Sequence, residues 1–210
     1  EGRSLLRQRA RYEVHFGAAG ADGVVFAREP DTSIELDDTA AGLQTSGYSS
    51  QHLRDFDADG QIDMMFRDVL VGIGGMVRAL VGHSVALDLE FFRMEADAYP
   101  GNPNATRSAR NFELLAGFGS VFFPPVLVGD VNGDGRLDLL LGQTPDELHV
   151  HVGVPGPGLL SQRPQSVAVA LPQDERNIWM ADLNQDGADD RLIHHASTTE
   201  PNRLRVLVVR

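Results

Sequence analysis

The chain has 210 residues, 42% of them hydrophobic, a formal net charge of −12 and no cysteine. The length is sufficient for one large hydrophobic core or two small ones, and the negative charge argues against a nucleic-acid partner, which needs a basic surface. The lack of cysteine excludes a disulfide scaffold, and no stretch reaches the roughly 18 apolar residues of a membrane helix, so we expect no transmembrane segment.

Short alternating segments in the N-terminal part predict strands separated by turns. Residues 12–16 alternate between polar and apolar side chains and predict a strand, and the Gly/Ala-rich residues 17–23 predict a turn. Residues 24–26 and 33–36 are further strand candidates, and the small polar residues 39–50 predict a loop.

The middle of the chain interrupts this pattern. Residues 62–66 predict the start of a strand, but apolar residues then recur at helical spacing, and we predict an inserted helix near 67–82. Residues 85–94 predict a strand again, and residues 99–108, rich in proline and asparagine, predict a surface loop.

The remainder of the chain is a series of short apolar segments. They predict strands at residues 112–116, 121–128, 137–141, 147–152, 166–171, 178–181, 190–194 and 203–209. Short strands with turn signals about every 8–12 residues predict an all-β fold.

Three segments, residues 55–63, 130–138 and 182–190, share the pattern D-x-[DN]-x-D-G-x-x-D. We number the nine residues of each loop from 1 to 9. Oxygen-bearing side chains occupy positions 1, 3, 5 and 9, and glycine occupies position 6. Alternate side chains then point inward and the glycine makes the sharp bend, which is how a chain wraps a hard cation such as calcium. The three copies predict up to three bound Ca²⁺ ions.

These loops are not EF-hands. An EF-hand needs an acidic residue at position 12, but that position holds Phe66, Leu141 and Ile193, and each loop runs into a strand-like segment. The closing ligand is then the aspartate at position 9, and position 7 contributes its backbone carbonyl. The predicted ligands are Asp55, Asp57, Asp59, Gln61 and Asp63 in the first loop, Asp130, Asn132, Asp134, Arg136 and Asp138 in the second, and Asp182, Asn184, Asp186, Ala188 and Asp190 in the third.

The second loop and its flanks, residues 127–142, resemble the FG-GAP (VCBS-type) repeat of integrin-α-like β-propellers. Upstream, residues 118–120 (Phe-Gly-Ser) are similar to the FG element of that family, whereas the GAP element is missing after Gly142. The first and third loops match the acidic motif only. The resemblance implies four-stranded blades, usually seven, with calcium in the hairpin between the first two strands of a blade.

The spacing of the loops fits such blades. The loops start 75 and 52 residues apart, and propeller repeats of about 40–50 residues are normal, so the shorter interval fits one blade. The longer interval exceeds it by 23 residues, close to the length of the proposed helix with its flanks. We therefore expect a single β-propeller segment over residues 1–210, with a blade part at 1–50, a blade at 51–120 with the helical insertion 67–82, a blade at 121–172 and a blade part at 173–210. These are about three to three and a half blades, and closure takes at least about four, so the remaining blades are expected from missing sequence or another chain.

Other candidate sites are weaker. His149 and His151 share one face of a predicted strand and His194 and His195 are adjacent, but polar strand faces are commoner than transition-metal sites and no third ligand is evident. Trp179 precedes the third loop and suits stacking on a sugar, although a large apolar residue is more often part of the core. No hydrolase or metalloprotease motif is present.

We expect a non-enzymatic, calcium-stabilised propeller that acts as a protein–protein, adhesion or scaffolding module. Calcium modules of millimolar affinity are typically extracellular, so we expect an extracellular or periplasmic location and a protein or carbohydrate partner. The regions at 66–82 and 99–108 depart most from a plain repeat and are the expected partner contact. The alternatives are an accessory propeller of an exported polysaccharide- or lipid-acting enzyme, and a structural subunit of a larger exported or membrane-associated complex.

Overall fold

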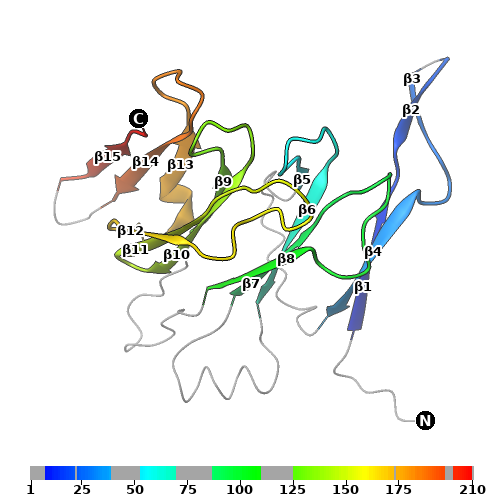
Figure 1. Ribbon diagram of the computed structural model, residues 1–210, viewed down its shortest axis with the longest axis horizontal. Coiled ribbons are helices and arrows are strands. Elements are labelled where there is room, and N and C mark those ends of the chain that lie inside the picture. Colours follow the sequence, from blue (N-terminus) through cyan, green and yellow to red (C-terminus); the bar gives the residue numbers. More distant parts are fainter. Residues whose placement is uncertain are drawn as a thin grey trace, which may run out of the picture.

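The computed structural model of the chain is an all-β structure built from several small antiparallel sheets (Figure 1). It describes residues 8–21, 23–38, 53–69, 87–109, 125–172, 174–196 and 201–209. Within these ranges the only helical element is a short 3-10 turn, η2 (Glu175–Asn177). Accordingly, no helix in the described ranges has the length and apolar character needed to cross a membrane. The expectation of an all-β chain is confirmed.

The N-terminal strands form two small pairs. Strand β1 (Gln8–Val14) pairs with β4 (Thr32–Asp38), and between them β2 (Gly17–Gly20) and β3 (Gly23–Phe26) form a hairpin. The turn predicted at residues 17–23 is therefore wrong for residues 17–20, which pair with β3. Glycine and alanine lack bulky side chains, but their backbone N–H and C=O groups still form a ladder once a partner strand is present.

Three larger sheets follow, and each is built from strands that are consecutive in the sequence. The first contains β5 (Leu53–Arg54), β6 (Asp63–Val69), β7 (Leu87–Phe92) and β8 (Ala105–Ala109). The second contains β9 (Val126–Gly129), β10 (Asp138–Thr144), β11 (Glu147–His151) and β12 (Gln165–Ala168). The third contains β13 (Ile178–Ala181), β14 (Asp190–His195) and β15 (Arg203–Leu207). In each sheet the acidic loop joins the first strand to the second.

The region between β6 and β8 differs from the prediction in two places. Most of the helix predicted near 67–82 lies outside the described residues, and so does most of the expected partner segment at 66–82. Residues 67–69, however, belong to β6 and pair with residues 87–89 of β7. The loop predicted at 99–108 ends in strand β8, where Ala105 and Ala109 are buried and the residues between them are not. A short polar segment forms an edge strand here because β7 supplies its hydrogen-bond partners. The strand predicted at 112–116 lies outside the described residues.

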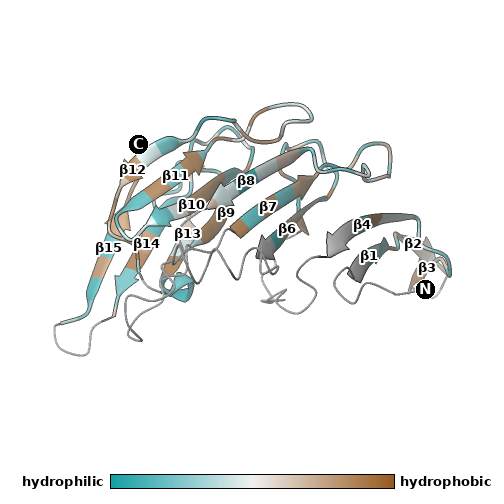
Figure 2. Cartoon of the chain, turned by 90° about the horizontal axis from the view of Figure 1, so that it is seen from below, coloured by the Kyte–Doolittle hydropathy of each residue, from teal (hydrophilic) through white to brown (hydrophobic). Residues whose placement is uncertain are grey.

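Side chains on both faces of the first and second sheets are buried. In β10, Leu139 and Leu141 join the cluster between the first and second sheets, whereas Leu140 between them joins the cluster between the second and third sheets. Successive side chains of a strand point to opposite faces, so a continuous apolar run is what a strand covered on both sides requires. Figure 2 shows the sheets in succession, from β14 and β15 at one end to β1 and β4 at the other.

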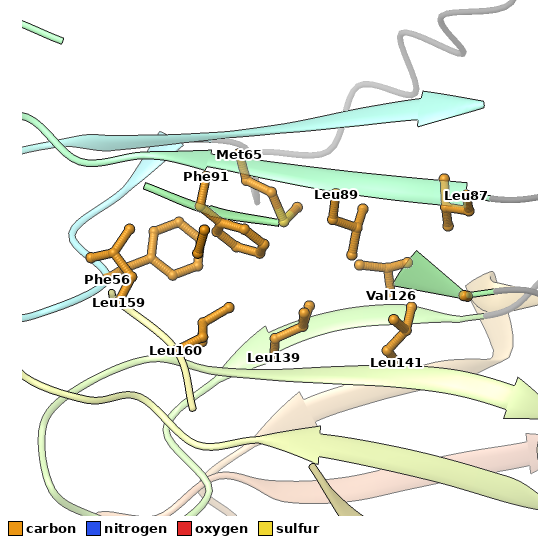
Figure 3. Close-up of a cluster of buried hydrophobic side chains, with 12 residues drawn as sticks. Phe56, Met65, Leu87, Leu89, Phe91, Val126, Leu139, Leu141, Leu159 and Leu160 are labelled. Atoms are coloured by element: carbon orange, nitrogen blue, oxygen red, sulfur yellow. The ribbon is translucent and has the colours of Figure 1, made fainter. Parts of the chain in front are cut away.

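The cluster between the first and second sheets is drawn in Figure 3. Side chains of β6 and β7 lie on one side of it and side chains of β10 and of the segment after β11 on the other. Its buried members are Phe56, Met65, Leu87, Leu89, Phe91, Ala105, Ala109, Val126, Leu139, Leu141, Leu159 and Leu160. A third cluster connects Ile34 of β4 to Met64 and Phe92 of the first sheet and to Met94 and Tyr99 in the segment between β7 and β8. Packing between neighbouring sheets thus links the three larger sheets and the β1–β4 pair, whereas the residues of β2 and β3 are exposed.

Truncating one of these inter-sheet side chains should destabilise the whole chain. Leu139 is fully buried, so Leu139→Ala leaves a cavity between two sheets, and we expect a loss of about 2–5 kcal/mol in the free energy of unfolding. Leu204 is 62% exposed, so Leu204→Ala serves as the control and should change stability by less than about 0.5 kcal/mol. Urea unfolding of the two variants would measure this difference, and equal losses would contradict the packing described above.

Candidate metal centre

The three acidic loops lie side by side at one end of the structure, at the top of Figure 1. Backbone hydrogen bonds link each loop to the next. The N–H of Leu137 in the second loop donates to the carbonyl of Phe56 in the first at 2.9 Å, and the N–H of Asp189 in the third donates to the carbonyl of Asp130 in the second at 2.5 Å. The backbone N–H at position 8 of the second and third loops is therefore hydrogen-bonded to the first or second residue of the preceding loop.

All three loops have the same unusual backbone at positions 4 and 6. The glycines at position 6, Gly60, Gly135 and Gly187, have φ angles of 88°, 85° and 91°. Position 4 also has a positive φ in each loop, at Ala58, Gly133 and Gln185. The left-handed conformation costs a non-glycine residue roughly 1–2 kcal/mol, so the first and third loops adopt it at position 4 only because other contacts of the loop compensate.

The acidic side chains supply those contacts. The carboxylate at position 1 accepts hydrogen bonds from the N–H groups of positions 5 and 6 in every loop, at 3.1 and 2.9 Å for Asp55, 3.2 and 2.7 Å for Asp130, and 3.1 and 3.0 Å for Asp182. The carboxylate at position 5 accepts from the N–H of position 7, which is Gln61, Arg136 or Ala188. The side chains at positions 1 and 5 thus face the backbone of their own loop.

The closing aspartates, Asp63, Asp138 and Asp190, are fully buried. In each, Oδ2 accepts a hydrogen bond from the N–H at position 2 of the same loop, at 2.9, 2.8 and 3.2 Å respectively. The other oxygen, Oδ1, accepts from a residue that follows the third strand of the sheet, which is Met94, Gly153 or Val209. One carboxylate therefore joins the first hairpin of each sheet to the end of its third strand.

Burial makes the closing carboxylates of the first and second loops harder to ionise. Desolvation raises the pKa of Asp63 to about 6, although hydrogen bonds from the N–H groups of Met94 and Phe56 favour the charged form. The negative charges of Asp57 and Asp59 raise this pKa further. Burial likewise raises the pKa of Asp138. A bound cation would offset this accumulation of negative charge, since an opposite charge nearby favours the ionised form.

The first loop contains the closest group of carboxylates. Oxygen atoms of Asp55, Asp57 and Asp63 lie within 4.8 Å of one another, and no other trio of histidine or acidic side chains in the described ranges is so close. In addition, Oδ1 of Asp57 is buried and accepts no hydrogen bond from the described residues. An all-oxygen donor set with an unused buried oxygen fits a hard cation such as Ca²⁺. Asp59, a fourth predicted ligand, is outside this trio, and Arg93 donates to both Asp57 and Asp59, at 2.5 and 2.7 Å.

The second and third loops differ at position 3. Asn132 and Asn184 replace the carboxylate there, and the amide nitrogen of each donates to the carboxylate at position 5, at 3.3 and 2.7 Å. Their amide oxygens accept the N–H of position 5 at 2.9 and 3.1 Å. The oxygen-bearing side chains of positions 3 and 5 therefore lie together in both loops. The metal ligands of the second and third loops stay a prediction.

Two residues that contact the acidic loops were not predicted from the sequence. Asp189 lies at position 8 of the third loop, and its Oδ2 accepts the N–H of Asp130 at 3.0 Å. The sequence offered one indication of this contact: position 8 is aspartate in the third loop but apolar in the other two. Arg93 contacts the first loop from beyond β7, and a residue so distant in the sequence gave no local signal.

A groove of about 390 Å³ lies between β8 and β11, and it contains two of the histidines considered above. It is lined by Thr106, Arg107, Ser108, Gln143, His149, His151, Gln162 and Pro164. Arg107 donates to the carbonyls of Thr106, Leu160 and Ser161, His151 Nδ1 lies 2.9 Å from the carbonyl of Ser161, and His149 is paired with Glu147. The bonds from Arg107 to Leu160 and Ser161 connect the segment after β11 to the first sheet.

Trp179 lies on β13 and is 46% exposed, so the expectation that it belongs to the core is wrong. Its neighbour Ile178 is buried between the second and third sheets, and the alternation of a strand turns Trp179 to the opposite face.

Comparisons with protein-family models, curated proteins and solved structures find no significant match to this chain. The function must be argued from the loops and sheets themselves.

Replacing a closing aspartate should destabilise the chain whether or not calcium is present. In Asp138→Asn the amide NH₂ faces one of the two backbone donors, from Val131 or Gly153, so one buried N–H loses its acceptor. We expect a loss of about 1–3 kcal/mol in the free energy of unfolding, both in calcium and in chelator. Asp134→Asn, at an exposed position of the same loop, is the control and should have its main effect in calcium. A calcium-restricted effect of Asp138→Asn would contradict its proposed role as a structural acceptor.

Acidification should reduce the contribution of His151 to the stability of the chain. Burial lowers the pKa of His151, and the nearby positive charge of Arg107 and the neighbouring His149 lower it further, so the folded state resists protonation. The unfolded chain takes up this proton near pH 6.5, so the contribution of His151 to stability should fall as the pH decreases below that value. The difference in unfolding free energy between wild type and His151→Asn, measured from pH 7.5 downward, should shrink. A difference independent of pH would contradict this.

Proposed function

We propose that this chain is an arc of a calcium-stabilised β-propeller of the FG-GAP type, and that it acts as a non-enzymatic binding or scaffolding module outside the cytoplasm. One observation carries the proposal. The same acidic loop, with the same hydrogen bonds at positions 1, 5 and 9, joins the first two strands of three successive sheets. The FG-GAP resemblance implies calcium in that same hairpin.

The arrangement of the sheets supports the propeller part of the proposal. Each sheet is formed by strands in sequence order, and neighbouring sheets pack through faces that are both apolar. The three loops lie at one end and are joined by hydrogen bonds. Radial repetition of such sheets protects their faces from water and leaves loops at the two ends for function.

Calcium would be held by the side chains at positions 1, 3, 5 and 9 of each loop and by the carbonyl at position 7. In the first loop, the nearest of these are the carboxylates of Asp55, Asp57 and Asp63. The ion would supply positive charge where aspartates converge, and so would stabilise the hairpin that each loop closes. Affinities typical of extracellular modules match the millimolar calcium outside cells and favour an exported protein.

Removing calcium should lower the thermal stability of the chain. Calcium present at about 100 times its Kd would stabilise the folded state by about 2.7 kcal/mol per site. Thermal unfolding in calcium and in chelator, with calorimetric titration to count the sites, would measure this. We expect a lower melting temperature in chelator, and an unchanged melting curve would refute the proposal.

A matched pair of variants tests which acids bind the ion. Asp134→Asn removes a carboxylate at position 5 of the second loop and should reduce the number of bound calcium ions by one. Asp146→Asn removes an exposed carboxylate from the turn between β10 and β11, outside the acidic loops, and should leave the stoichiometry unchanged. Equal effects of the two would mean that calcium responds only to net charge.

A further inference from the structure

Arg93 is fixed against the first acidic loop. Its Nε donates to Oδ2 of Asp57 at 2.5 Å, its Nη2 donates to Oδ2 of Asp59 at 2.7 Å, and its Nη1 donates to Glu95 at 2.7 Å. The Arg93 side chain is 17% exposed and that of Asp57 only 4%. A charge pair so little exposed to water is weakly screened, and the planar guanidinium fits several carboxylates at once.

The other two loops have no cation at this position. Arg93 directly precedes Met94, whose N–H binds the closing Asp63, and the residues in the same place for the second and third loops are Val152 and Val208. The internal repeat therefore provides its own comparison, in which one loop of three carries an arginine where the others carry valine.

The arginine coincides with an additional acid. Position 3 is Asp57 in the first loop and asparagine in the other two. The asparagines donate to the carboxylate at position 5, so the second and third loops hold this pair together without a cation. In the first loop two carboxylates occupy positions 3 and 5, and Arg93 bridges them. The extra negative charge and the extra positive charge of the first loop are matched.

The loops also differ in the cations available to their position-5 aspartates. Asp134 in the second loop has Arg136, an ion pair that is partly exposed at 30% and 33% for the two side chains. Asp186 in the third loop accepts hydrogen bonds from the amide of Asn184 and the N–H of Ala188, and has no ion pair among the described residues. Exposed ion pairs contribute little, so compensation of the charges at positions 3 and 5 is strongest in the first loop and weakest in the third. The buried Arg191 acts instead on the closing aspartates, Asp138 and Asp190.

We propose that Arg93 is a built-in counter-cation that keeps the first loop folded when metal is withdrawn, whereas the second and third loops depend on the metal. This inference rests on the proposed calcium binding of those two loops. Arg93 does not take the place of the ion. It holds Oδ2 of both Asp57 and Asp59, and leaves the buried Oδ1 of Asp57 without a hydrogen-bond donor among the described residues, so that this oxygen is available to a cation.

Three equivalent amides report on the three loops. The N–H groups of Gly60, Gly135 and Gly187 donate to the carboxylates of Asp55, Asp130 and Asp182, at 2.9, 2.7 and 3.0 Å. Their hydrogen-exchange rates, measured by NMR in calcium and in chelator, compare local opening at the same position of each loop. On chelation we expect exchange at Gly135 and Gly187 to accelerate by at least about tenfold, and exchange at Gly60 by less than about threefold.

Two variants separate the charge of Arg93 from its packing. Arg93→Val introduces the residue found at the equivalent positions, and it should make exchange at Gly60 at least as sensitive to chelation as exchange at Gly135. Asp57→Asn/Arg93→Val recreates the pairing of the other two loops, and should slow exchange at Gly60 in chelator relative to Arg93→Val alone. A role limited to packing of the arginine stem predicts no such rescue.

The outcomes are distinguishable. If Gly135 and Gly187 respond to chelation and wild-type Gly60 responds equally, this inference is overturned while the proposed function stands. If Gly135 and Gly187 do not respond, the calcium role itself fails and the inference with it. The wild-type measurement decides between these outcomes even where a variant does not fold.

Discussion

The closing aspartates are the contacts on which each repeated unit depends. Asp63, Asp138 and Asp190 are fully buried carboxylates, and each accepts one backbone N–H from its own loop and one from beyond the third strand of its sheet. A buried carboxylate is costly unless both oxygens are used, and here both are. The same group therefore fixes the shape of the loop and the position of the loop relative to the rest of the sheet.

Packing between sheets extends this local order along the chain. Alternate residues of β10 belong to different hydrophobic clusters, so this one strand contributes to the packing on both faces of its sheet. The loops follow the same succession, because position 8 of the second and of the third loop is hydrogen-bonded to the beginning of the loop before it. The acidic surface that results is a consequence of sheet stacking, since the loops are distant in the sequence and adjacent only through their sheets.

Equivalent loops need not be equivalent in energy. All three share the backbone conformation and the hydrogen bonds of positions 1, 5 and 9, but they compensate the charges at positions 3 and 5 differently, by an arginine in the first and by asparagine amides in the others. A repeated motif thus specifies a geometry, and residues outside the motif determine how its carboxylates are paired. In the first loop that residue is Arg93, which lies beyond β7.

The sequence by itself determined the all-β class, most strand positions and the nine-residue acidic loops, because alternation, glycine placement and oxygen spacing act over a few neighbouring residues. It did not identify β8 or the last residues of β6, whose strand conformation depends on hydrogen bonds from β7. Nor did it identify Arg93 and Asp189 as partners of the loops. Those contacts join residues that only the stacking of sheets brings together, so the tertiary structure determined them. The free energy of a buried ion pair or hydrogen bond depends on which groups meet. A local sequence pattern holds no information about a group more than thirty residues away.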